Sequence, residues 1–170
     1  MTLQQKMLVK NSKKAFTLVE LVVVIAILSI LAAIAIPMVT GIIQSAIDSS
    51  KESDASTLNQ ACKTFFTSVA VGTITQESVT TAGITYSGTA LPTEASTQST
   101  KNATANTLTV ADACNYNGLT NVQAAITDFG YINGGTGSAV IIYKSTASSG
   151  VTVSDITDTT TLSDIYGKMG

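Results

Sequence analysis

The chain lacks several residues on which enzymes most often depend. Its 170 residues include nine lysines but no arginine, histidine or tryptophan, and only two prolines and two cysteines. Without histidine, neither a Ser/His/Asp nor a Cys/His arrangement can form, and a common nitrogen ligand of zinc is missing. We therefore predict that the protein is not an enzyme, and we expect no cofactor and no metal site.

Two short patterns that suggest ligand binding are incomplete. The G-G-T-G sequence at Gly134 and Gly135 resembles a phosphate-binding loop, but no Lys-Ser/Thr and no helix signal follow it, so it predicts a turn. Asp155, Asp158 and Asp164 do not have the spacing of an EF-hand calcium loop. We interpret them as part of a solvated acidic tail.

The two cysteines, Cys62 and Cys114, leave two interpretations open. They lie 52 positions apart (114 minus 62), and neither belongs to a C-x-x-C pair. A single pair fits one disulfide in an exported protein, and it fits two buried thiols equally well.

Charge is distributed unevenly along the chain. The formal net charge is -2, but four of the nine lysines precede Phe16. Without residues 1–15 the balance is 5 lysines against 11 acidic residues, or -6. Because an acidic chain repels phosphate groups, we expect no specific binding to nucleic acid.

A long apolar run follows this basic leader. From Phe16 to Val39, 24 residues are interrupted only by Thr17, Glu20 and Ser29 before the proline at position 37. As a helix this run would span about 36 Å, enough to cross a hydrocarbon core of about 30 Å. The lysines before it predict a cytoplasmic N-terminus and an exported remainder. An ordinary signal peptide is the alternative, but the run is longer than a usual signal core and no A-x-A-like site follows.

Glu20 is the feature that a simple membrane anchor does not explain. A carboxylate within a bilayer costs about 2.5–3.5 kcal/mol on insertion scales, and such residues usually have a partner. If the mature chain begins at Phe16, its α-amino group, with a reference pKa of about 7.7–8.0, would be largely protonated and could pair with Glu20.

The sequence K-K-A-F-T-L-V-E-L-V-V-V-I-A-I-L-S-I-L-A-A-I-A-I-P resembles the N-terminal signature of type IV pilins and of type II secretion pseudopilins. The resemblance implies cleavage between Ala15 and Phe16 by prepilin peptidase, followed by N-methylation of Phe16. Pro37 falls where the family's helix carries a proline, and we expect it to kink the helix. Ala15 departs from the glycine that usually precedes the cut.

The same resemblance implies how the protein would assemble. In a bundle of N-terminal helices, Glu20 of one subunit would meet the Phe16 amine of a neighbour; pairing within one helix is the alternative. The family further implies an assembly ATPase, a polytopic platform protein, a single-pass precursor in the cytoplasmic membrane and an extracellular pilus. Implied roles are adhesion, surface (twitching) motility, aggregation or DNA uptake. The leading hypothesis is a major pilin; a pseudopilin and a minor, ligand-binding tip pilin are the alternatives.

The predicted fold class is α+β. We expect a long helix whose hydrophobic half protrudes and whose C-terminal half packs on a small antiparallel sheet. The expected segments are a cleaved leader (1–15), a transmembrane and filament-core helix (16–41), its amphipathic continuation (42–72) and a globular, β-rich head (73–170). In the continuation, Phe65 and Phe66 are predicted to lie in the core. Two helices, the second capped by Ser53 or Ser56, are the alternative.

Short apolar runs separated by Thr, Ser and Gly predict the elements of the head. The expected strands cover residues 84–86, 107–110, 139–144 and 151–154, with a turn at 148–150 joining the last two. Helical spacing predicts a short helix over residues 119–129. Residues 91–106 and 133–138 are expected to be surface loops, the first carrying a formal glycosylation sequon at Asn102.

Overall fold

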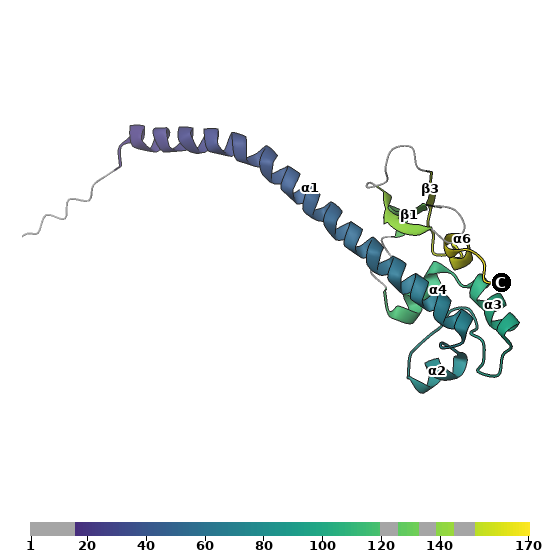
Figure 1. The fold of residues 1–170 in the computed structure, drawn as a ribbon. Helices are drawn as coiled ribbons and strands as arrows, with labels where there is room; N and C mark the ends of the chain where they lie inside the picture. The colour runs from purple at the N-terminus through teal and green to yellow at the C-terminus, as the bar shows by residue number, and fades with distance from the viewer. Residues whose placement is uncertain (1–15, 120–125, 133–138, 145–151) are drawn as a thin grey trace, which may run out of the picture. The chain divides into compact units, whose positions relative to one another are not determined.

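The structure is a computed structural model that describes residues 16–119, 126–132, 139–144 and 152–170. The chain divides into two compact units, Met1–Ser45 and Ala46–Gly170. Helix α1 (Leu18–Val71) belongs to both units. A long N-terminal helix with a small antiparallel sheet and further helices makes the fold α+β, as predicted (Figure 1).

Helix α1 is continuous over 54 residues, including the polar stretch at 48–56, so the two-helix alternative is wrong. It ends where the sequence predicts, at a glycine in the left-handed region. Gly72 has φ of 87°, and the N–H groups of Gly72 and Thr73 both donate to the carbonyl oxygen of Ser68 at 3.0 and 2.8 Å. These bonds satisfy a carbonyl that the end of the helix would leave without a partner.

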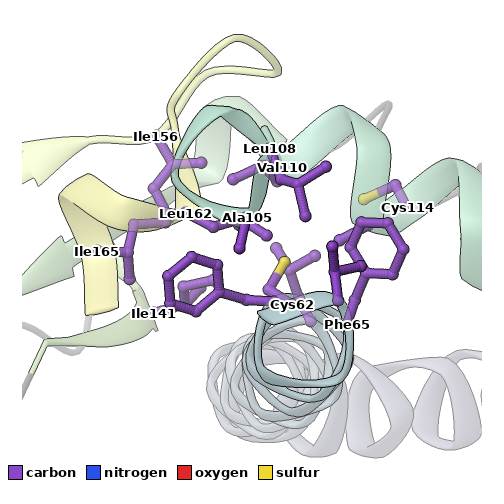
Figure 2. Packing of buried hydrophobic residues seen from close by; sticks show 14 of the residues in the cluster. Cys62, Phe65, Ala105, Leu108, Val110, Cys114, Ile141, Ile156, Leu162 and Ile165 are labelled. Atoms are coloured by element: carbon purple, nitrogen blue, oxygen red, sulfur yellow. The ribbon is translucent and has the colours of Figure 1, made fainter. Parts of the chain in front are cut away.

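The last turns of α1 supply one side of the hydrophobic core of the C-terminal unit. Phe65 and Phe66 are buried, which confirms their predicted place. Figure 2 shows Cys62 and Phe65 of α1 facing apolar side chains from later in the chain. Those neighbours include Ala105, Leu108, Val110, Ile156, Leu162 and Ile165. The core therefore depends on residues up to 94 positions beyond the end of α1 (165 minus 71).

Short helices occupy several positions where strands or loops were predicted. They are α2 (Gln76–Thr81), α3 (Gln98–Thr107), α4 (Val110–Asn117) and α6 (Leu162–Tyr166). Each begins after a threonine whose side chain accepts a hydrogen bond from the backbone N–H three residues on; the four caps are Thr75, Thr97, Thr109 and Thr161. Threonine is common in strands but is also a good N-cap, which is why these helices were missed.

These helices correct specific predictions. Residues 84–86 have no regular structure, and Thr109 makes only an isolated bridge with Thr161, so the strands predicted at 84–86 and 107–110 are wrong. Residues 98–107 are helical, so the loop predicted at 91–106 ends early. The sequon residue Asn102 lies on α3, where its amide donates to the Gly170 carbonyl and accepts a bond from Gln98 at 2.7 Å.

The sheet has three antiparallel strands in the order β2-β1-β3. Strands β2 (Val140–Tyr143) and β3 (Val153–Asp155) lie close to their predicted positions, but each pairs with β1 (Phe129–Ile132) and they do not pair with each other. Phe129, which was predicted to end a helix over residues 119–129, begins this strand, and before it lies a 3-10 turn, η1 (Ile126–Asp128). Residues 120–125 of that predicted helix lie outside the described residues. The predicted turns at 133–138 and 148–150 lie outside the described residues.

The C-terminal segment is folded, which corrects its interpretation as a solvated acidic tail. Ile156, Leu162 and Ile165 are buried in the core. The carboxylate of Asp164 accepts a bond from the Thr161 hydroxyl at 2.6 Å, beside the cap of α6. The acidic residues suggested a polar tail, but burial of the apolar residues between them holds the segment against the core.

Candidate functional site: the N-terminal helix

The first turn of α1 is capped by Thr17. The backbone N–H of Glu20 donates to the Thr17 hydroxyl oxygen at 3.2 Å and to the Thr17 carbonyl oxygen at 3.1 Å. No role was predicted for Thr17, although the T-x-x-E spacing is typical of a capping box. The cap starts the helix directly after Phe16, so the helix needs nothing from the basic leader to begin.

The apolar side chains of α1 are exposed along the first eight turns. Phe16 is 81% exposed, and the large apolar residues from Leu18 to Ile47 are exposed as well. An unbroken apolar surface of this size is rare on soluble monomers and marks contact with a membrane or with protein. Within the described residues, α1 is long and apolar enough to cross a bilayer, and its most apolar window is entirely exposed.

Two hydroxyl groups, one within the apolar run and one just after it, donate hydrogen bonds to backbone carbonyls of the same helix. The Ser29 hydroxyl donates to the Ile25 carbonyl at 2.7 Å, and the Thr40 hydroxyl donates to the Pro37 carbonyl at 2.9 Å. Bonds of this kind let hydroxyl groups enter an apolar medium at reduced cost. Pro37 lies inside α1, and the helix continues through it. The kink expected there remains a prediction.

The residues predicted to govern processing and assembly lie at this end of α1. Phe16 and Glu20 are both exposed, so both can contact another molecule. The ion pairs of Lys51 with Asp128 and of Lys144 with Asp155 do not involve Glu20. Ala15, on the other side of the predicted cleavage site, lies outside the described residues.

Among its described residues, the C-terminal unit contains no group of three or more His, Cys, Asp or Glu side chains that could hold a metal ion. Its buried carboxylate, Asp112, is held by five hydrogen bonds: from the N–H and hydroxyl of Thr89 (both 2.8 Å), the N–H and hydroxyl of Thr109 (both 2.9 Å) and the Tyr86 hydroxyl (3.2 Å). Burial disfavours the ionised form, but the bonds from Thr89 and Thr109 outweigh it and lower the pKa of Asp112. Asp112 thus has a structural role.

Cys62 and Cys114 are buried free thiols in the structure. Burial raises the pKa of both, that of Cys114 to about 11, so both are protonated at neutral pH. Because the thiolate is the reactive form, neither cysteine is suited to nucleophilic chemistry. The disulfide between them stays a prediction.

Comparison with known proteins points to the same end of the chain. Residues 10–36 match the family model described as the prokaryotic N-terminal methylation motif, which is typical of type IV pilin-like precursors. The match covers the basic flank, Phe16, Glu20 and most of the apolar run. Searches of curated proteins and of solved structures gave no significant match.

The motif and the exposed apolar helix together support a type IV pilin-like or pseudopilin protein. This family is one of structural proteins, not of enzymes. The chain joins an apolar N-terminal helix to a folded C-terminal unit. This arrangement, with the motif, fits a precursor that is anchored in the membrane and later joins a surface assembly.

Proposed function

We propose that the protein is a structural subunit of a type IV pilus, and specifically its major pilin. The observation that carries this proposal is the match of residues 10–36 to the N-terminal methylation motif. The exposed apolar surface of α1 supports it, because the same helix can lie in the bilayer before assembly and pack against copies of itself afterwards. The filament would serve adhesion, motility or aggregation at the cell surface.

The proposed division of the chain follows from this role. Residues 1–15 form the leader that prepilin peptidase removes, 16–41 the membrane and filament-core helix, 42–72 its continuation and 73–170 the displayed head. The cap on α1 is compatible with cleavage, since Thr17 and Glu20 both lie after the cut. Extraction and polymerisation would use an assembly ATPase and a platform protein.

Glu20 is the residue we propose to set the axial register of the filament. Its carboxylate would pair with the methylated α-amino group of Phe16 on a neighbouring subunit. A charge buried without a partner costs several kcal/mol, so subunits out of register would be disfavoured. Exposure of both residues in the isolated chain supports this pairing.

The first test is the mass and N-terminal sequence of the mature protein. We expect a chain that begins with N-methylated Phe16. A start at any other residue would remove the basis of the assembly proposal. Because Ala15 replaces the usual glycine, Ala15→Gly is the informative variant, and we expect it to be processed at least as fast as the natural sequence.

The second test compares two carboxylates of α1. Glu20→Gln should leave the C-terminal unit folded and the precursor processed, but it should abolish or strongly reduce filaments. Glu52→Gln is the matched control, since Glu52 is exposed on the same helix beyond the apolar run. Equal filament yield from the two variants would contradict the role of Glu20.

Abundance distinguishes a major pilin from the alternatives. A major subunit should dominate the mass of fibres sheared from cells and seen by electron microscopy. A pseudopilin or a minor tip pilin would be a small fraction of such fibres or absent from them.

A further inference from the structure

The three-stranded sheet carries a group of apolar side chains on the face that points away from the hydrophobic core. Alternate residues of a strand point to opposite faces, and Phe129 and Ile141 belong to the face that is buried in the core. The other face carries an apolar set that we call the outer-face patch: Ile132, Val140, Ile142 and Val153.

The register places three members of the outer-face patch in one row. Ile132 of β1 lies opposite Val140 of β2 on one side and opposite Val153 of β3 on the other. Ile142 lies in the next row, opposite Gly130. The four side chains therefore form a continuous apolar surface across all three strands.

The outer-face patch is partly accessible and does not belong to the core. Val140 is 45% exposed, and Ile132, Ile142 and Val153 are half-buried. Among the described residues, the half-buried apolar side chains that pack on the core include Tyr131 and Tyr143 but none of these four. An antiparallel sheet that covers a core on one face normally carries polar residues on the other. Four apolar residues in that place indicate a contact surface.

An ion pair borders the outer-face patch. Lys144, just after β2, reaches Asp155 of β3 at 2.6 Å between Nζ and Oδ1. Gly130 of the intervening strand makes this possible: a Cβ there would lie 3.3 Å from Lys144 Cγ and 2.4 Å from Val153 Cγ1. An apolar centre with a charged border is the usual composition of a protein contact.

We infer that the outer-face patch contacts a second copy of this chain in the assembled filament. The small size of the patch distinguishes a neighbour that is already held in place from a partner that binds from solution. A stable interface between two free proteins buries about 800 Å² per partner, from roughly 20–30 residues a side. Four partly exposed side chains are far fewer. They can contribute only where another contact already holds the partner nearby, because such tethering raises its effective concentration.

A neighbouring subunit in a filament meets this condition, since bundled N-terminal helices would hold it in place. The inference thus rests on the proposed function. It adds a lateral contact between C-terminal units, which would make the filament resistant to dissociation beyond what its helical core provides.

The test uses the same substitution at two exposed valines. Val140→Lys places a charge in the outer-face patch, whereas Val71→Lys, at a residue 71% exposed at the end of α1, makes the same change elsewhere. Both variants should fold and be processed like the natural chain. We expect Val140→Lys filaments to dissociate at a lower detergent concentration or temperature, or to fall at least tenfold in yield, and Val71→Lys filaments to behave normally. Equal filament stability of the two variants would overturn the inference.

A crosslinking experiment identifies the occupant. A photocrosslinking amino acid is incorporated in place of Val140 during synthesis and is activated by light in intact filaments, so that no reagent has to reach the covered position. We expect covalent dimers of this chain in filaments and none in detergent-separated subunits. Crosslinks only to another protein, or none in filaments, would refute the contact. If the natural chain forms no filaments at all, the proposed function is refuted. If it forms filaments but gives no crosslinks at position 140, only the contact of the outer-face patch is refuted.

Discussion

Replacing Asp112 with alanine removes the shared acceptor of five hydrogen bonds in the C-terminal unit. The hydroxyls of Tyr86, Thr89 and Thr109 can rotate toward other acceptors, but the backbone N–H groups of Thr89 and Thr109 cannot. Each buried N–H without an acceptor costs about 1–3 kcal/mol. Part of this cost is offset, because the variant no longer has to remove the Asp112 carboxylate from water when it folds. We expect the free energy of unfolding to fall by about 3 kcal/mol for Asp112→Ala.

The effect should depend on pH in a defined direction. The pKa of Asp112 is lowered in the folded protein, so the unfolded chain binds its proton first as the pH falls. The contribution of Asp112 is therefore fully present above its unfolded pKa of about 3.9 and is lost as the pH falls through the lower folded pKa. The difference between the natural chain and Asp112→Ala should be constant from pH 7 to about 5 and should shrink below about pH 4.

The assay is urea unfolding of the full chain in detergent micelles, followed by circular dichroism at several pH values. Asp54→Ala is the control, since Asp54 is an exposed carboxylate on α1 and its loss should change the free energy by no more than about 0.5 kcal/mol. If Asp112→Ala unfolds at the same urea concentration as Asp54→Ala at pH 7, then the five bonds do not stabilise the fold as argued.

Two further predictions concern the sheet and the thiols. Gly130→Ala should destabilise the C-terminal unit by about 1–3 kcal/mol, because a Cβ there would lie 2.4 Å from Val153 Cγ1; an unchanged unfolding midpoint would contradict the packing of β3 on β1. Cys62 and Cys114 should resist a thiol reagent in the folded chain and both react after denaturation without reductant. Labelling that requires reductant would show that the pair is a disulfide.

Local patterns were enough to predict the N-terminal half of the protein. The length of the apolar run, the lysines before it and Glu20 within it predicted a long helix and the family resemblance, and α1 with the methylation motif at 10–36 agrees with both. These features can be predicted from sequence because the length and hydropathy of one continuous segment are enough to indicate a helix that contacts lipid or copies of itself. The burial of Phe65 and Phe66 followed from helical spacing in the same way.

The head was harder to predict because its short elements depend on contacts between distant residues. Threonine serves both strands and helix caps, and only tertiary packing decided that Thr75, Thr97, Thr109 and Thr161 begin helices. The pairing of β1 with both β2 and β3 likewise joins segments separated in sequence.

The sequence by itself determined the character of the N-terminal helix: apolar, marked by Glu20 and preceded by a basic leader, whereas the cap at Thr17 came from the structure. Tertiary structure alone decided what the C-terminal unit presents to its surroundings. A strand register assigns each residue to one face of a sheet, and a shift by one residue would exchange the faces. Only that register shows that Ile132, Val140, Ile142 and Val153 lie together away from the core.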